Sequence, residues 1–401
     1  MADGQGINKR ISFKKETTWG VKATASAAKY LRRVTGTFQL EKDTYASDEI
    51  RLSQQTSDMR HGTRRATGSL SGEIAGGSYE EFMSAALRKD FAAGVTTGTV
   101  TTISVGESAG VSTFIRSSGS FISDGFKIGD PVTGLGFASP SNNGLYIIVA
   151  VVALTMTVEH FAEGGLLVVA SAGASVSLRV KGRKTLVPLT GHTDDSFTIE
   201  EWNPDVPSSR TYLGAQVDSM AINISPNSMA TIEFGFLGKN AETATALEYF
   251  TTPTAQGITG VYSSPDGLLL INGVASRKVT SLSVSLANAI AQESVIGSTS
   301  IGAKSRGKVA VTLSGSAIFE DNVILGYFDA ETEVSITYAL RAASGTDAFV
   351  MTMPRVKIGS GTNDDGEKVI ILSFDGTALE YGAGSTVIDA TTLAIIDTTI
   401  A

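Results

Sequence analysis

The sequence of 401 residues has no cysteine, only two tryptophans and three histidines, and these absences exclude several classes of protein. Without cysteine, the chain can form no disulfide, no thiolate metal site and no cysteine nucleophile, which is typical of a protein assembled in a reducing cytoplasm. The histidines, His61, His160 and His192, are far apart, and no two have the spacing of metal ligands on a helix or hairpin. We therefore predict no metal site and no other cofactor.

The chain also lacks a long hydrophobic segment. Its longest apolar run, Leu145–Leu154, is about half of the roughly 20 residues that a membrane-spanning helix needs. Residues Met1–Arg10 contain no apolar core that could act as a secretory signal. The sequence therefore predicts neither export nor membrane insertion.

Positive charge is in deficit, because 32 Lys and Arg residues stand against 40 Asp and Glu residues, for a net charge of −8. Proteins that grip nucleic acid usually carry the opposite sign, since their affinity comes from neutralising phosphates. DNA can be a neighbour of this chain but is not expected to be a tightly held ligand. The sequence contains no P-loop and no Gly-x-Ser-x-Gly elbow, so we predict no enzymatic activity.

Alternation of apolar and polar residues is abundant, for example at Leu282, Val284 and Leu286. Period two over many segments predicts antiparallel strands with one buried face. One helix is predicted at Tyr79–Leu87, where apolar residues recur at helical spacing and Ser78 with Glu81 matches a capping box. The predicted fold class is mainly β.

Three short motifs occur twice in the same order along the chain. The first copies are Arg32–Thr35, Leu70–Gly72 and Phe236–Gly238, and the second copies are Arg277–Thr280, Leu313–Gly315 and Phe374–Gly376. A helix-like segment follows the middle motif in each copy, near Tyr79 and near Phe319. Motifs repeated in a constant order predict an internal duplication, with two antiparallel β-sandwich or barrel domains that each carry a short helix.

The first copy is much longer than the second, and its extra residues include strands and turns of their own. We therefore predict a small inserted β domain at residues 95–182, facing outward and dispensable for assembly. The expected layout is a first domain at residues 1–94 and 183–255, the insert, and a second domain at residues 256–401.

A long polar segment separates the first paired strands of each copy, at Glu41–Ala66 and Ala287–Ser305. Structureless loops of this length are uncommon unless they have a function. Arginines in the first loop could contact DNA, but acidic neighbours leave little net field, so contacts between subunits are favoured. The candidate contact residues are Asp43, Asp48, Glu49, Arg51, Asp58, Arg60, Arg64, Arg65, Glu293, Lys304 and Arg306.

The motifs of the second half carry a family resemblance. Gly307–Val309, Val311–Gly315, Phe319–Asp321, Thr332–Ser335 and Met353–Lys357 together resemble the tail-tube proteins of bacteriophages with long, non-contractile tails, the siphophage type. Lys15–Gly20 resembles the opening segment of the same family. The resemblance implies a structural subunit of the virion tail, assembled in the bacterial host cytoplasm, whose stacked rings form a conduit for DNA.

The resemblance also implies partners and a ring size. The partners are other copies of the chain, the tape-measure protein and DNA inside the lumen, and the tail terminator and distal tail proteins. Rings of the family typically present six equivalent positions, so two copies per chain predict three chains per ring with pseudo-sixfold symmetry. The alternative is a ring of six chains in which the second repeat of each chain is an external decoration, and the sequence leaves this alternative open.

Three other classes of protein remain as alternatives: another phage or secretion-tube subunit, a capsid-decoration protein and a carbohydrate-binding β-sandwich protein. The last class would need clustered exposed aromatic residues, and the two tryptophans, Trp19 and Trp202, are far apart in the sequence.

Overall fold

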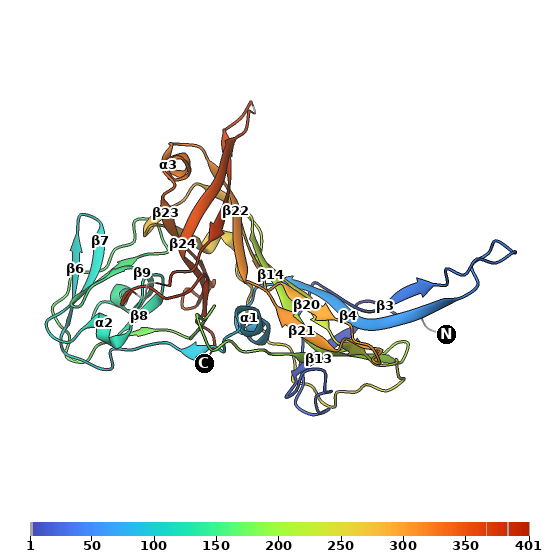
Figure 1. The fold of residues 1–401 in the computed structure, drawn as a ribbon. Coiled ribbons are helices and arrows are strands. Elements are labelled where there is room, and N and C mark those ends of the chain that lie inside the picture. The colour runs from blue at the N-terminus through green and yellow to red at the C-terminus, as the bar shows by residue number, and fades with distance from the viewer. Residues whose placement is uncertain (1–2, 366, 383–384, 401) are drawn as a thin grey trace.

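The computed structural model describes residues 3–365, 367–382 and 385–400. Antiparallel strands dominate it, and the helices α1 (Glu80–Leu87), α2 (Phe121–Asp124) and α3 (Val323–Asp329) are short (Figure 1). The prediction of a mainly β protein is confirmed. Within the described residues, no helix is long and apolar enough to cross a membrane.

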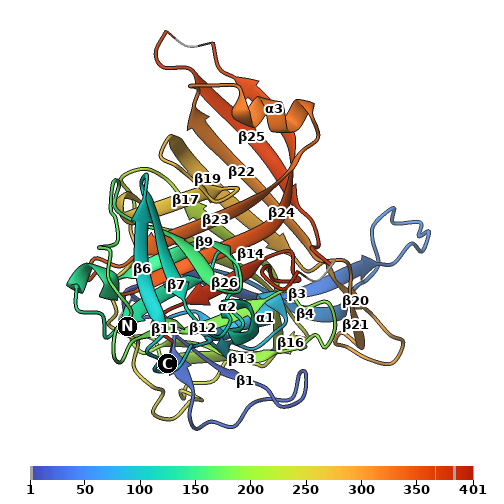
Figure 2. The same ribbon diagram turned by 90° about the vertical axis from the view of Figure 1, so that its left-hand side faces the viewer.

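A run of eight antiparallel strands contains both halves of the chain (Figures 1 and 2). In spatial order the strands are β3 (Thr35–Ala46), β4 (Met59–Glu73), β15 (Thr231–Gly238), β14 (Ser208–Ile224), β19 (Val279–Ala287), β22 (Ala310–Ile318), β25 (Ile371–Ala378) and β24 (Ala348–Asn363). The halves meet where β14 pairs with β19 and Ile222 lies opposite Val284. We call this set the main strand run.

The strands β14 and β24 each continue into a second group of strands. The first part of β14 pairs with β13 (Phe197–Asn203), which pairs with β1 (Arg10–Lys15). The first part of β24 pairs with β23 (Glu333–Arg341), which pairs with β17 (Gly267–Ile271). The flanking short strands are β2 (Lys29–Tyr30), β5 (Ala92–Ala93), β12 (Arg183–Leu186), β16 (Asn240–Ala241), β18 (Val274–Ser276) and β26 (Ala394–Asp397).

The strands β14 and β24 also carry irregularities at matching points. In β14 the pairing with β13 shifts just after Tyr212, and the pairing with β15 shifts just after Val217. In β24 the pairing with β23 shifts just after Met353, and the pairing with β25 shifts just after Ile358. Both shifts are five positions apart in each strand. Such β-bulges bend a strand, so β14 and β24 change direction at equivalent places.

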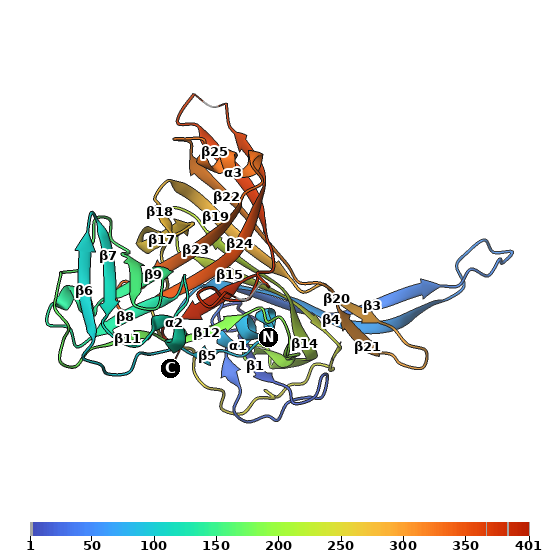
Figure 3. The ribbon, with the colours of Figure 1, turned by 60° about the vertical axis from the view of Figure 1, so that its left-hand side comes forward.

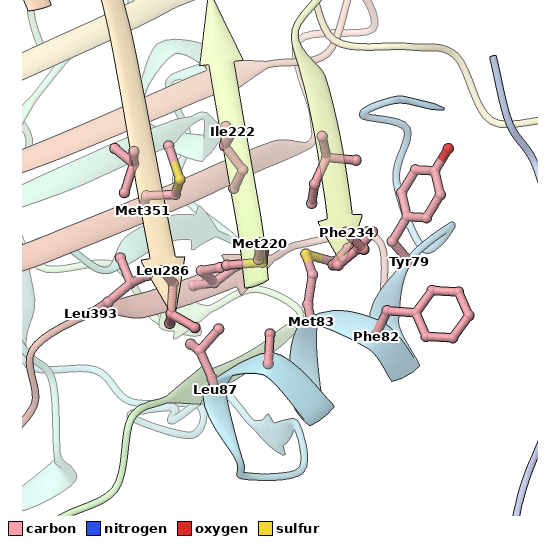
Figure 4. Packing of buried hydrophobic residues seen from close by; sticks show 14 of the residues in the cluster. Tyr79, Phe82, Met83, Leu87, Met220, Ile222, Phe234, Leu286, Met351 and Leu393 are labelled. Atoms are coloured by element: carbon pink, nitrogen blue, oxygen red, sulfur yellow. The ribbon is translucent and has the colours of Figure 1, made fainter. Parts of the chain in front are cut away.

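Helix α1 is buried by side chains from both halves of the chain (Figure 4). Phe82 is fully buried, and its ring centroid lies 5.6 Å from that of Phe234 on β15. Leu286 on β19 and Met351 on β24 belong to the same buried cluster. The two halves therefore share one hydrophobic core.

The predicted helix at Tyr79–Leu87 is confirmed, but its capping box is not formed. Within the described part of the chain, no side chain caps the first turn, and the buried Ser78 hydroxyl finds no hydrogen-bond partner. The Glu81 carboxylate instead lies 2.6 Å from the Lys29 ammonium, so a tertiary ion pair replaces the local cap. In the second half the helix is α3, which begins at Val323, beyond the predicted segment near Phe319.

A separate six-stranded sheet lies to one side of the main strand run (Figure 3). Its strands, in order, are β11 (Ser177–Val180), β8 (Pro131–Leu135), β9 (Leu145–Val151), β10 (Thr155–Glu159), β7 (Val111–Arg116) and β6 (Ile103–Ser108). The chain enters and leaves this region at one place, because the Gly94 N–H donates to the Gly182 carbonyl at 3.0 Å.

The six-stranded sheet does not bury its apolar residues alone. Its core also includes Leu268 and Leu270 on β17, Val350 on β24 and Ile396 on β26, each at most 2% exposed. Removing residues 95–182 would expose these side chains. The shared core is therefore at odds with the expectation that the insert is dispensable.

A buried charge cluster joins the sheet to the rest of the chain. The Lys184 ammonium lies 2.5 Å from Asp130 of the insert and also pairs with Asp389 near the C-terminus. Burial raises the pKa of Asp130 to about 6, because it outweighs the attraction of Lys184, and the Asp389 charge adds to the effect. Three segments that are distant in the sequence are thus linked by one lysine.

The two segments expected to be structureless loops form hairpins. Residues 41–66 continue β3 and β4 out to the pair Ala46–Met59, and the Ser47 N–H donates to the Asp58 carbonyl at 2.8 Å. Within residues 287–305, β20 (Ile290–Glu293) pairs with β21 (Ala303–Arg306). The polar sequence hides these strands because neither hairpin has a buried face to impose apolar alternation.

Candidate assembly surfaces

The end of the β3–β4 hairpin, residues 41–66, projects away from the rest of the molecule (Figures 1 and 3). We call it the arm. At its base Arg65 lies 3.0 Å from Glu41 and 3.2 Å from Asp43. Hydrogen bonds from Arg65, Thr67 and Gln39 lower the pKa of Glu41. This network links the two strands at the base of the arm through paired charges.

Among the residues that the structure describes, the predicted contact residues near the tip pair locally. Arg51 pairs with Glu49 at 2.8 Å, Arg60 pairs with Asp58 at 3.3 Å, and Asp48 is exposed. Five acidic and five basic residues between positions 41 and 66 leave the arm without net charge. A surface with equal numbers of positive and negative charges suits contact with another copy of the chain better than contact with DNA.

The tip also carries apolar side chains that sequence reasoning missed. Ile50 and Leu52 are fully exposed, and Tyr45 and Met59 are each 59% exposed. Single exposed apolar residues are ordinary, but four of them on one projecting hairpin mark an interaction surface. In the sequence, Ile50 and Leu52 stand singly among polar and charged residues, so no apolar pattern marks them.

The β20–β21 hairpin has a different set of contacts. Lys304 lies 2.5 Å and Arg306 lies 2.9 Å from Asp194, which sits in the segment before β13. Burial alone would raise the pKa of Asp194, but hydrogen bonds from Lys304 and Gln216 lower it below its usual value. Glu293 on the partner strand is exposed and lies opposite Ala303.

The two hairpins, more than 200 residues apart in the sequence, lie side by side. The Arg64 backbone N–H donates to the Thr299 carbonyl at 2.9 Å, and its guanidinium donates to the Thr299 hydroxyl at 3.0 Å. Gln292 donates to the Gly238 carbonyl at the end of β15. The structure thus joins part of the predicted contact set, Arg64 with the β20–β21 hairpin, into one surface.

One face of the main strand run is covered with hydroxyl groups. On β19 and β22 the buried leucines and valines alternate with residues whose side chains lie on the other face of the sheet. These residues are Ser281, Ser283, Ser285, Thr312, Ser314 and Ser316. Their side chains are exposed or half-buried. The acidic residues on the same face include Glu233 on β15 and Asp375 on β25. This face is polar without concentrating positive charge.

Within the described residues, no group of three His, Asp or Glu side chains is arranged to hold a metal ion. The distinctive features are instead surfaces: a projecting arm, a second hairpin against it, and a broad hydroxyl face on a sheet that joins the halves of the chain. These features suit a structural protein that assembles with other copies of itself.

Comparison with known proteins agrees with this reading. No curated protein matches the chain significantly. A family model described as phage tail tube protein matches residues 6–378, nearly the whole chain. Proteins of such a family assemble with copies of themselves in the virion tail and are structural, not enzymatic. The chain belongs to the phage tail tube protein family and is a structural subunit of the tail tube.

Proposed function

We propose that the chain is the major tube subunit of a long, non-contractile tail and that three chains form each ring. The observation that carries the ring size is the repeated plan of the fold. Each half consists of a hairpin, then a helix, then three further strands. In the first half these are β3–β4, α1 and β13 to β15, and in the second half β19–β22, α3 and β23 to β25. The strands β14 and β24 have bulges at matching points. Two equivalent units per chain would fill six positions with three chains.

The same plan supports an internal duplication. In this layout, residues 1–94 with 183–255 make the first tube unit, residues 256–401 make the second, and residues 95–182 are inserted in the first. The units share a core and a continuous sheet, so they are halves of one folded body that follow the same pattern.

The hydroxyl face of the main strand run is the surface best suited to line the lumen. Serine and threonine hydroxyls offer no fixed positive charge to hold phosphates, while Glu233 and Asp375 repel them. The opposite face is apolar, and α1 packs against part of it. DNA and the tape-measure protein could then move through the channel without strong attachment.

The remaining surfaces suit contacts along the tube. The arm, with the β20–β21 hairpin against its base, would reach the adjacent ring and contact it through the exposed apolar tip and the balanced charges. Terminal rings would present the same surfaces to the tail terminator and distal tail proteins. Asp43, Asp48, Glu49, Arg51, Asp58, Arg60, Arg64 and Arg65, with Glu293, Lys304 and Arg306, lie on or beside these hairpins.

Negative-stain microscopy of the purified chain over a range of concentrations tests the proposal. We expect tubes of constant diameter with a stain-filled central channel. Filaments without a channel, or isolated particles at every concentration, would contradict it.

A further inference from the structure

The two ends of the main strand run are open edges. Within the described residues, β3 is hydrogen-bonded as a strand only to β4, and the last residues of β24, from Ile358 to Asn363, pair only with β25. Part of the β3 edge is capped, since Tyr212 donates to the Phe38 carbonyl and Glu201 accepts from the Phe38 N–H. At Leu40 and Lys42, further along the same edge, the described residues provide no such cap. Exposed edges are templates for pairing with another chain.

The chain contains an internal model of how these edges could be covered. The last part of β14 is equivalent to the last part of β24, because both follow the second bulge. In the first half that edge of β14 is occupied by β19, with Ser219 opposite Ala287 and Met220 opposite Leu286. The Asn288 N–H donates to the Asp218 carbonyl at 2.7 Å and fixes the hydrogen-bonding register.

The strand equivalent to β19 is β3, as the cross-strand partners show. Across β15, β4 and β3, the partners in line with Ser219 are Gly235, Ser69 and Thr37. Across β25, β22 and β19, the partners in line with Ser360 are Asp375, Ser314 and Ser283. Thr37 therefore corresponds to Ser283, and by the same count Leu40 corresponds to Leu286, Glu41 to Ala287 and Lys42 to Asn288.

We infer that the open edge of β24 binds β3 of a second copy of this chain, in the register that β19 uses on β14. Ser360 then lies opposite Glu41 of the neighbouring copy, and Gly361 lies opposite Leu40. This inference rests on the proposed ring of repeated units and names the contact that closes it. The pairing would extend to Thr362 opposite Gln39 once the Phe38 backbone exchanges its hydrogen bonds with Tyr212 and Glu201 for hydrogen bonds to β24.

Helix α3 supplies an independent observation. In the first half, α1 is covered by β19: Leu286 packs in the same cluster, and the buried Asn288 side chain donates to the Ala86 carbonyl at 3.0 Å. In the second half, the part of the chain that the structure describes places no strand over α3 in this way, and Val323 and Phe328 are 50% and 40% exposed.

A neighbouring β3 would complete this environment. Leu40 would take the place of Leu286 over the apolar side of α3. Lys42 would take the place of Asn288, near carbonyls of the last helical turn, where a cation is favoured by the helix dipole. The open edge and the uncovered helix thus fit the same partner.

Paired cysteines test the register in a chain that has no cysteine of its own. In the template, Ser219 and Ala287 form a non-hydrogen-bonded pair, for which Cα atoms lie about 4.5 Å apart, within the range of a disulfide. The variant Glu41→Cys/Ser360→Cys should therefore oxidise in assembled tubes into covalent trimers on a non-reducing gel. The variant Gln39→Cys/Thr362→Cys should do the same.

Two controls decide the interpretation. Ser219→Cys/Ala287→Cys should form a disulfide within one chain, because it repeats the pair inside the template. Glu41→Cys/Asp375→Cys should stay unlinked, because Asp375 lies one strand further away, roughly 4.8 Å beyond Ser360.

Tubes in which the template pair links but neither interchain pair does would overturn this inference and leave the tube function standing. Failure of the unmodified chain to form tubes would instead count against the proposed function.

Discussion

Removing the tip of the arm is expected to leave a folded subunit that no longer stacks into tubes. Residues 47–58 can be replaced by Asn-Gly, which connects the paired residues Ala46 and Met59 through a two-residue hairpin turn. The tip contributes nothing to the buried core, so the melting temperature should stay within a few degrees of that of the unmodified chain. Microscopy should show rings or single subunits in place of tubes.

The apolar side chains should account for most of this effect. Full burial of a side chain such as Ile50 or Leu52 contributes about 1.5–3 kcal/mol, and every ring repeats the contact. The double variant Ile50→Ser/Leu52→Ser should therefore shorten tubes strongly while preserving every charge. Val152→Ser/Leu154→Ser is a matched control, because these residues are also exposed but lie in the turn between β9 and β10 of the six-stranded sheet. Normal tubes from the arm variants would show that stacking does not depend on the tip.

Replacing residues 95–182 with a Gly-Ser linker is expected to yield an insoluble or aggregated protein. The residues on either side of the insert are close enough for a short linker, because Ala93 and Arg183 are cross-strand partners, so chain closure is not the obstacle. The obstacle is the exposure of Leu268, Leu270 and Val350. Burial of three such side chains is worth roughly 5–9 kcal/mol, comparable with the whole stability of an ordinary domain.

A compensated variant separates this cause from others. The same linker combined with Leu268→Thr, Leu270→Thr and Val350→Thr should recover part of the soluble yield, since threonine suits an exposed strand. Soluble, tube-forming protein from the uncompensated linker variant would show that the insert is a dispensable decoration. Solubility and tube length of the two linker variants are the measurements to compare.

Strand content and the main helix could be predicted because they depend on local patterns. The alternation at Leu282, Val284 and Leu286 reports one buried face, and the stripe at Tyr79, Phe82 and Leu87 reports one buried side of a helix. Under the proposed duplication, the repeated motifs lie on corresponding strands, but the cross-strand partners give a slightly different alignment from the motifs. Cross-strand partners align Leu70 with Gly315, whereas the motif match aligned it with Leu313.

Features set by tertiary contacts could not be predicted. The arm is strand on both sides but has no buried face, so its sequence resembles a polar loop. Asp194 pairs with Lys304 and Arg306 across more than 100 residues, and no local spacing marks that contact. The packing of the insert on β17 and β24 was equally hidden, because Leu268 and Val350 fit a strand core whichever neighbour buries them.

The central claim is that each ring contains three chains, whose paired halves fill six equivalent positions. Mass per unit length of assembled tubes from scanning transmission microscopy, combined with the axial ring repeat, measures the number of chains directly. We expect three chains of 41.7 kDa in each ring repeat. Six chains in each repeat would contradict the claim and would make the second half of the chain an external decoration.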